Sequence, residues 1–399
     1  MYKKAALLFL YADTPLHSGS GTSITDLDLP IQREVHTDLP LHNGSGLKGV
    51  FRKEKADLDG LPDLKRAVQT LEAQADDLKK NGQGESKDDD LVVKNAELEA
   101  ARSVLQQARG PLEAIFGPDT NRADEHSGSL AFCDAGILLF PVRSLAGTFA
   151  WITCPLVLSR LHRDLRKVVY QPPGAAQQPE GGEEEEGKSK TDPPSIEEVT
   201  KALQYIAATN LLAVTDPQNS SDLALVATNS PLLAWNNQIV LEDLTFVKSN
   251  QEEAAKGVRV IGRWLAAYAL PNDEAYTYWQ TRLPSALVVV SDEVFRDFTR
   301  FSTEVVSRIR IGETGTVVEG ALWVEENLPA DCLLWGLTLA TKPRVSNSGV
   351  KDADDVLKVM AELLNQVPAL QVGGNETIGR GFVQATLRRT EDMRPTLAA

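Results

Sequence analysis

The residues best suited to chemistry lie in one early stretch, from His17 to Arg52 (HSGSGTSITDLDLPIQREVHTDLPLHNGSGLKGVFR). It contains three of the five histidines, two Gly/Ser loops and the carboxylates of Asp26 and Asp28. A carboxylate can hold a hard divalent cation or accept a proton, and an imidazole can exchange protons near neutral pH. Asp26 and Asp28 are two residues apart, so in an extended segment both would lie on one face. Both could equally cap turns, and the stretch alone leaves this open.

The end of the same stretch is typical of a helix start that binds phosphate. A helix beginning near Ser45 would direct free backbone N–H groups and the positive end of its dipole toward solvent. Lys48 and Arg52 follow four residues apart, so both would lie on one helix face and add positive charge there. The sequence GSGLKG also matches a dinucleotide-binding fingerprint, but no βαβ unit follows it. We therefore expect phosphodiester binding rather than a nucleotide cofactor.

A second glycine-rich loop, at 373–382 (GGNETIGRGF), lies near the other end of the chain. Arg380 stands between two glycines, so its guanidinium could reach a phosphate while the glycines let the backbones approach closely. For this loop taken alone, an ordinary hairpin turn is the alternative. Upstream, Arg308 and Arg310 alternate on a strand-like run and would face the same way. RNA contact and a solvated strand face are equally open for them.

The net charge of −15 argues at first against a nucleic-acid partner, since phosphate binding needs a basic footprint. The charge is unevenly distributed, however. Segment 54–113 carries 14 acidic and 9 basic residues, and segment 171–198 carries 8 acidic and 2 basic residues. The rest of the chain is close to neutral, so the total charge does not exclude RNA as a partner.

Cysteine usage and hydropathy place the chain in the cytoplasm. Cys133, Cys154 and Cys332 are scattered without a CxxC pair, which excludes a zinc ribbon and argues against a disulfide scaffold. The first twelve residues imitate a signal peptide, but the apolar run is short and no small-residue cleavage site follows. No apolar run approaches the roughly 18 residues that a membrane span needs. We therefore expect no membrane association.

Hydrophobic patterning predicts an α+β fold on a ferredoxin-like sheet. An apolar run predicts a buried strand over 3–12, and leucines at seven-residue spacing on both sides of NGQGESKDDD predict an antiparallel helical hairpin over 54–110. Segment 171–195 is rich in Pro, Gly and Glu and should be disordered. Further strands are predicted within 128–158, 238–248, 285–291, 303–311 and 317–324 and in a β-loop-β unit over 369–389, and further helices over 159–169, 196–211 and 352–366.

Several blocks in one order resemble a known family. LHSGSGTSITDLDLPIQREVHTDLPLHNGSGLKGVFR is similar to the N-terminal signature of the RAMP superfamily. Within it, D-x-P-I-Q-R-E followed by S-x-L-K-G-x-x-R resembles the backbone subunit of type III-B CRISPR (Cmr) effector complexes. FGPD, HSGSLAFCDAGILLFPVRSLAGTFAWITCPLVLSR, TEVVSRIRIGETGTVVEGALWVEENLP and GGNETIGRGFV follow in the same order. These blocks span most of the chain outside 54–110 and 171–195.

The resemblance implies an RRM-like ferredoxin core, the RAMP palm, with a thumb and an inserted helical hairpin. The domains then read as core (1–53), inserted hairpin (54–110), core (111–170), acidic linker (171–195) and core with thumb and glycine-rich loop (196–399). It also implies several copies stacked in a filament along one guide RNA, alongside other Cmr subunits, in the cytoplasm of a prokaryote. The expected activity is metal-dependent cleavage of single-stranded target RNA paired to the guide, in antiviral defence.

The resemblance also assigns site residues. The family's catalytic aspartate stands two residues before P-I-Q-R-E, which here is Asp28, and its histidine before G-S-G corresponds to His17. No His/Asp/Glu cluster has the spacing of a preformed metal cage, so Asp28 and RNA are expected to recruit a divalent ion, Mg²⁺, together. The residues expected to contact RNA are Ser20, Gly21, Ser45, Lys48, Arg52, Arg308, Arg310, Gly379, Arg380 and Gly381.

Three alternatives accompany this interpretation. The chain could be a scaffold that binds guide RNA without cutting, or the related backbone subunit of a type III-A complex, which the P-I-Q-R-E and V-R-S-L blocks disfavour. Asp26 could take the catalytic part assigned to Asp28. Outside this set, His36 and His42 are interpreted as structural, and Leu29 to Glu34 as the anchor of the loop.

Overall fold

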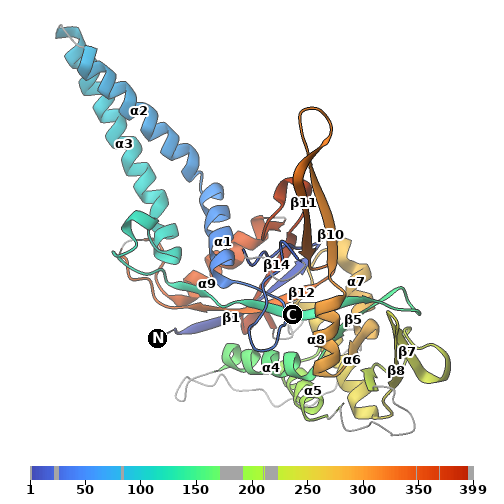
Figure 1. The fold of residues 1–399 in the computed structure, drawn as a ribbon. Helices are drawn as coiled ribbons and strands as arrows, with labels where there is room; N and C mark the ends of the chain where they lie inside the picture. Colours follow the sequence, from blue (N-terminus) through green and yellow to red (C-terminus); the bar gives the residue numbers. More distant parts are fainter. Residues whose placement is uncertain are drawn as a thin grey trace, which may run out of the picture. The chain divides into compact units, whose positions relative to one another are not determined.

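The computed structural model describes two compact units (Figure 1). Unit 1 comprises Met1–Lys4, Ser45–Phe132 and Thr338–Val367, and unit 2 comprises Ala5–Gly44, Cys133–Leu337 and Pro368–Ala399. Within these bounds the structure describes residues 2–21, 27–81, 85–170, 192–209, 211, 223–346, 348–367 and 369–393. The rival candidate Asp26 and nearly all of the predicted acidic linker, 171–191, lie outside the described residues.

Unit 1 is mainly helical. Its elements are α1 (Gly44–Leu58, whose first residue belongs to unit 2), α2 (Leu61–Asn81), α3 (Glu85–Phe116), β3 (Leu130–Phe132) and α9 (Ala353–Gln366). The helices α2 and α3 pack together as the long antiparallel hairpin drawn in blue and teal in Figure 1. Val68, Ala75 and Leu98 of the heptad stripe are buried, which confirms the predicted hairpin. Arg102 of α3 also joins Glu72 of α2, with 2.7 Å between Nη2 and the carboxylate.

Stacked aromatic rings form the core of unit 1 beneath the hairpin. Phe51 of α1 lies flat against Phe132 of β3 with 5.0 Å between ring centroids, and Phe116 at the end of α3 is parallel to the same ring. The predicted acidic cap of α9 is confirmed, because the Asp352 carboxylate accepts the backbone N–H groups of Asp354 and Asp355. The contact between Phe116 and Phe132 joins the C-terminal end of α3 to β3 through apolar packing.

Unit 2 is built around a large mixed sheet. Its strands are β1 (Lys4–Ala12), β2 (Leu41–His42), β4 (Ala135–Arg143), β5 (Phe149–Thr153), β6 (Leu223–Val226), β7 (Gln238–Leu241), β8 (Leu244–Lys248), β9 (Leu287–Val289), β12 (Leu333–Ala340), β13 (Leu370–Gln371) and β14 (Phe382–Arg388). They lie in the order β13-β14-β1-β12-β4-β5-β9-β6-β8-β7, while β2 pairs with β4. β5 and β6 each have one parallel neighbour, whereas β1 and β14 are antiparallel. The chain is therefore a mixed α+β protein.

In the described part of unit 2, five α-helices accompany this sheet. They are α4 (Pro155–Val169), α5 (Ile196–Ala208), α6 (Glu252–Tyr268), α7 (Thr277–Ala286) and α8 (Asp292–Phe301). The apolar stripe predicted on 159–169 is buried in α4 at Leu158, Leu161 and Leu165. Trp264 of α6 is fully buried and meets the edge of Phe9 in β1, with 6.2 Å between ring centroids.

A separate two-stranded ribbon, β10 (Glu304–Ile311) and β11 (Val317–Asn327), forms an antiparallel pair within unit 2 (orange in Figure 1). Val305, Ile309 and Leu322 are at least half exposed on it. The base of the ribbon, at 324–327, is instead largely shielded from solvent, since Glu325, Glu326 and Asn327 are buried. The ribbon therefore has a solvated outer part and a base enclosed by neighbouring segments.

Several boundaries differ from the sequence prediction. Residues 155–158, predicted to end a core strand, begin α4 instead, since proline suits the first helical turn. The strand predicted over 285–291 is limited to β9, and 238–248 is a hairpin of β7 and β8. Patterning did not single out α6, α8, β6 or β12. The predicted domain boundaries at 53/54 and 110/111 fall inside α1 and α3, and the division into inserted and core segments stays a prediction.

Candidate functional site

The segment containing Asp28 runs along the base of the ribbon. The Val324 N–H donates to Asp28 Oδ2 at 2.8 Å, and the Leu29 N–H donates to the Val324 carbonyl at 3.1 Å. The Glu326 N–H then donates to the Leu29 carbonyl at 3.0 Å, so residues 28 and 29 lie beside β11 as a parallel neighbour. Asp28 itself is exposed. Its carboxylate is thus fixed through one oxygen at the solvent edge of a buried strand end.

The same strand end holds His17. The imidazole is 7% exposed, and its Nδ1 lies 2.7 Å from the Glu326 carbonyl oxygen. Because a carbonyl only accepts, Nδ1 carries the proton, and Nε2 is left as the nitrogen that can exchange one. The anchoring residues Val324 and Glu326 are two positions apart on β11, which corresponds to about 7 Å along a strand. The structure therefore brings the two predicted catalytic residues to one short segment.

A buried ion pair locks this arrangement. The carboxylate of Glu326 pairs with Arg33 at 2.5 Å and accepts the Ile31 N–H at 3.1 Å and the Thr303 hydroxyl at 3.0 Å. These contacts confirm that Leu29 to Glu34 anchor the loop. Sequence reasoning missed the partner, although two consecutive acids at the end of an apolar strand, in WVEENLP, are a usable signal for a buried pair.

The glycine-rich loop packs on the backbone beside His17. Gly374 N–H donates to the His17 carbonyl at 2.9 Å, and Gly381 N–H donates to the Pro15 carbonyl at 2.9 Å. A Cβ on Gly373 would lie 2.2 Å from the His17 carbonyl oxygen, and one on Gly381 would lie 2.1 Å from that of Val372. These two glycines serve close approach within the protein, whereas Gly379, also at positive φ (77°), has open space around it.

Replacing these glycines by alanine should separate the two roles. Gly373→Ala and Gly381→Ala should lower the free energy of unfolding by at least about 2 kcal/mol, because backbone must move to admit the new Cβ. Gly379→Ala should cost only about 1 kcal/mol, since it adds strain at positive φ without a clash. Chemical denaturation of the three variants measures the difference. Equal losses for Gly381→Ala and Gly379→Ala would contradict the packing role.

The loop that follows His17 also contains one fixed and one open position. The Ser20 N–H donates to the Pro30 carbonyl at 3.0 Å, which fixes this residue against the anchor segment. Gly21 has φ 77° with no atom within 4 Å of a built Cβ. Of the glycines predicted to contact RNA, Gly21 and Gly379 therefore lie at open positions, and Gly381 is packed inside the protein.

Two predicted RNA-contacting arginines of unit 2 are engaged in ion pairs. Arg308 Nε lies 2.9 Å from a carboxylate oxygen of buried Glu325, and Arg380 Nη1 lies 3.4 Å from Glu304. Arg310 is exposed, but the strand register shifts between residues 309 and 311. The expectation that Arg308 and Arg310 face the same way stays a prediction, because this shift in pairing with β11 does not fix the directions of their side chains.

In unit 1, Arg52 and Lys48 differ in their partners. Arg52 Nη1 donates to the Gly117 carbonyl at 2.5 Å, and Nη2 pairs with Asp119 at 2.9 Å. Partial burial would raise the pKa of Asp119, but its cationic neighbours, Arg52 among them, lower it overall. Burial, and secondarily the charge of Arg52, lowers the pKa of Lys48. A bound anion would offset both effects, so Lys48 is the better placed of the two for a phosphate.

The start of α1 is partly capped. Ser45 is exposed in the first turn, as expected for a phosphate-binding helix start. The Gly44 N–H, however, donates to Asp134 Oδ1 at 2.8 Å. The carboxylate caps this one N–H group, which belongs to the residue before the expected helix start at Ser45.

Behind the loop, Ser18 and His42 form a buried pair with 2.7 Å between Oγ and Nδ1. Burial lowers the pKa of His42 to about 4, and Asp134 offsets this only in part. The unfolded chain takes up this proton near the ordinary value of 6.5, so stability from His42 is present above that pH and is lost as pH falls toward 4. His42 is therefore structural, as expected.

This linkage predicts a measurable pH dependence. Between pH 7 and pH 4, His42 should cost about 3 kcal/mol of the free energy of unfolding, and His42→Asn should remove that part of the slope. Denaturant titrations of both proteins at several pH values measure the difference between the two slopes. Parallel slopes would show that His42 does not titrate as its burial requires.

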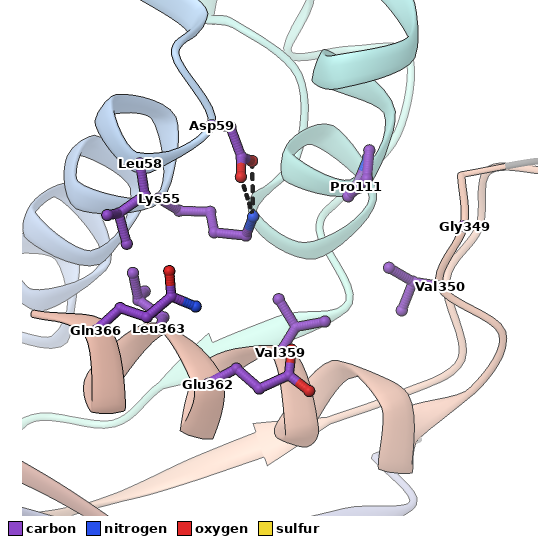
Figure 2. Close-up of a pocket in the computed structure, with 10 residues that line it drawn as sticks. All are labelled: Lys55, Leu58, Asp59, Pro111, Gly349, Val350, Val359, Glu362, Leu363 and Gln366. Carbon is purple, nitrogen blue, oxygen red and sulfur yellow. Dashed lines mark hydrogen bonds and ion pairs between the residues drawn. The ribbon is translucent and has the colours of Figure 1, made fainter.

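Unit 1 also has a cavity of about 260 Å³ between α1, α3 and α9. Figure 2 shows Lys55 of α1 joined to Asp59, the residue after α1, and the side chains of Glu362 and Gln366 on the α9 side of the cavity. The two Lys55–Asp59 contacts are 2.5 and 2.6 Å. No predicted site residue lines this cavity. Among the residues that the structure describes, no group of three His, Cys, Asp or Glu side chains is arranged to hold a metal, and the recruitment of a divalent ion by Asp28 and RNA stays a prediction.

Taken together, the fold and site define a mixed-sheet α+β protein with an exposed carboxylate and a fixed imidazole beside a glycine-rich loop. The RAMP superfamily pattern matches residues 9–384. The "CRISPR system Cmr endoribonuclease Cmr4" of Pyrococcus furiosus is 31% identical over 388 residues, 96% of each chain. The chain therefore belongs to the RAMP superfamily and, within it, to the Cmr4 family.

Solved structures agree with this assignment at the level of the fold. The crystal structure of oligomeric Cmr4 from Pyrococcus furiosus is 24% identical, covers 97% of this chain and 98% of that chain, and has a TM-score of 0.53. A chain of the type III-B Cmr-beta complex bound to cognate target RNA is 18% identical, with 97% and 98% covered and a TM-score of 0.59. In the described part of this chain, no helix combines the length and apolar character needed to cross a membrane.

Proposed function

We propose that this protein is the backbone subunit of a type III-B CRISPR effector complex, which binds guide RNA and cleaves the paired target RNA. The observation that carries the proposal is the 31% identity to an endoribonuclease over 96% of both chains. The arrangement of Asp28 and His17 on one end of β11 supports it chemically. Its place would be the prokaryotic cytoplasm, where guide and target RNA meet.

Asp28 fits the part of the metal-holding residue. Mg²⁺ is commonly held by one or two carboxylates together with waters and substrate phosphates, and an exposed carboxylate fixed through one oxygen meets that need. When bound there, the ion would supply positive charge to the scissile phosphodiester. The carboxylate itself could accept the proton of a ribose 2′-OH as that oxygen attacks the adjacent phosphorus.

His17 fits the part of the proton donor to the leaving group. As the P–O5′ bond breaks, the 5′ oxygen needs a proton, and Nε2 of a protonated His17 could supply it. The hydrogen bond from Nδ1 to the Glu326 carbonyl fixes the ring plane, so no reorientation is required at that step. The products would be a 2′,3′-cyclic phosphate and a 5′-hydroxyl.

The residues proposed to bind the RNA backbone come from both units. In unit 1, Ser45, Lys48 and Arg52 would bind guide phosphates at the start of α1. In unit 2, Ser20, Gly21 and the glycine-rich loop would allow close approach of the RNA backbone. Arg310 would bind phosphate, and Arg308 and Arg380 would do so once RNA competes with their ion pairs. Guide–target pairing, not the protein, would supply sequence specificity.

The finer architecture follows the same proposal. The large sheet would contain the RRM-like ferredoxin core, or palm, the β10–β11 ribbon would be the thumb, and α2–α3 would be an inserted hairpin. Copies of the chain would stack along one guide RNA with other Cmr subunits. The oligomeric state of Cmr4 in the Pyrococcus furiosus crystal structure supports the contact between copies.

The test is cleavage by the assembled complex. The full set of subunits on a guide RNA should cut an end-labelled complementary RNA at regular intervals with Mg²⁺, once for each copy of this chain, and a chelator should stop the cutting. A mismatched target RNA is the control. A complex that assembles and binds target yet leaves it intact with Mg²⁺ would favour a non-cleaving scaffold, for which the role of Asp28 in capping β11 would be sufficient.

A further inference from the structure

Gln32 makes four hydrogen bonds between the loop that follows His17 and the residues that lead into α1. Its side-chain Nε2 donates to the Gly19 carbonyl at 2.8 Å, and its Oε1 accepts the Asn43 N–H at 2.9 Å. Its backbone N–H donates to the Ser18 carbonyl at 2.7 Å, and its carbonyl accepts the Leu41 N–H at 3.0 Å. One residue thus connects two segments through both its main chain and its side chain.

The contact with Gly19 falls at a decisive point of the loop. Gly19 is two residues after His17, and the chain continues through Ser20 to Gly21, which has positive φ and open surroundings. The Gln32 amide therefore fixes a carbonyl that lies between His17 and Gly21. Further along the chain, β11 holds Asp28.

We propose that Gln32 is a positioning residue that fixes residues 18–20, the part of the loop next to His17, in the geometry needed for RNA cleavage. This rests on the proposed function, and it assigns Gln32 no contact with RNA. The side chain acts by donating one N–H to Gly19, while its acceptor holds Asn43, the residue immediately before α1. Loss of the donor should loosen the loop alone, whereas loss of both groups should release both segments.

Gln32→Glu tests the donor specifically. A carboxylate still accepts the Asn43 N–H but offers no hydrogen to the Gly19 carbonyl and repels it. The single-turnover cleavage rate of the assembled complex should fall at least about tenfold, while assembly on guide RNA and the apparent affinity for target stay unchanged. Gln280→Glu is the matched control, because Gln280 also donates its amide to one carbonyl, that of Pro271, in another part of unit 2.

The pH profile distinguishes positioning from a general loss of structure. Protonation returns a donor to Glu at position 32, so the rate of Gln32→Glu relative to the unmodified complex should rise as pH falls from 8 to 5.5. A constant ratio across that range, or an unchanged rate at pH 8, would overturn the proposal. Gln32→Met, which keeps the shape and has neither group, should stay slow at every pH.

Hydrogen exchange gives a readout that does not depend on cleavage. Backbone amides at 18–21 should exchange faster in Gln32→Glu, while those at 41–44 keep the exchange rates of the unmodified protein. Unchanged exchange at 18–21 would overturn the proposal even if no RNA is cut. Conversely, the unmodified complex could fail to cut RNA while residues 18–21 still exchange faster in Gln32→Glu. That result would refute the proposed function and keep the part of Gln32 in fixing residues 18–20.

Discussion

Asp28→Asn is expected to reduce the single-turnover rate of target cleavage about 10³-fold in the assembled complex and to leave its assembly on guide RNA unchanged. The amide has the size of the carboxylate, and its oxygen can still accept the Val324 N–H that now reaches Asp28 at 2.8 Å. What it loses is the negative charge that holds a divalent ion and accepts a proton. Quenched-flow cleavage of labelled target at saturating Mg²⁺ measures the rate.

Asp273→Asn is the matched control for this substitution. Asp273 is also an exposed carboxylate that accepts one backbone N–H, from Ala275 at 2.8 Å, in a segment without a proposed role in RNA cleavage. The complex with Asp273→Asn should cut target RNA at the same rate as the unmodified complex. An Asp28→Asn complex that retains full activity would sink the assignment and move the catalytic part to Asp26, for which Asp26→Asn is then the direct test.

Local patterns in the sequence were enough to predict the elements whose stability is local. The heptad leucines predict α2 and α3 because each stripe must be covered by the other helix. Asp352 predicts the start of α9 for the same kind of reason, since the first N–H groups of a helix need an acceptor nearby in sequence. The run at 3–12 predicts β1 because no charged residue interrupts it after its start.

The contacts that hold the site are far apart in sequence, and periodicity does not contain them. His17 and Glu326 are separated by 309 residues, and Arg33 and Glu326 by 293. The resemblance pointed to Asp28 and His17 but not to the strand end that fixes both. Gly381 was expected to let RNA approach closely. The fold shows instead that a side chain there would meet the Val372 carbonyl oxygen, which the sequence does not reveal.

The ion-pair partners of the positively charged residues could not be predicted from the sequence either. Their types and spacing predict phosphate binding, yet the neighbours that share their charge come from distant segments. Arg308 lies next to Glu325 across the ribbon, and Arg52 next to Asp119 beyond the hairpin. An arginine so paired contributes to RNA binding only if the phosphate competes with its carboxylate. Lys48, with a lowered pKa, faces the opposite situation, since an anion would relieve it.

The second large effect is expected in stability. Arg33→Ala should lower the free energy of unfolding by about 3–5 kcal/mol, because it leaves the Glu326 carboxylate buried without its charged partner. The exposed fractions of the two side chains are 15% and 3%, so water can replace little of the lost contact. The guanidinium also donates to the carbonyls of Asp38 and Thr299 at 3.0 Å, and both bonds are lost with it. Urea denaturation of the isolated chain measures the change.

Arg300→Ala provides the comparison, because Arg300 pairs with Asp38 at 3.7 Å in a setting where the side chains are 57% and 41% exposed. Solvent screens such a pair, so the loss should be less than about 1 kcal/mol. Both variants remove one guanidinium from one carboxylate, so the difference between them reports the burial of the Arg33 pair together with its two hydrogen bonds to carbonyls. Similar losses would mean that the Arg33–Glu326 pair does not fix the base of the ribbon. In that case the common anchoring of His17 and Asp28 on β11 would have to rest on their hydrogen bonds with the main chain of Val324 and Glu326.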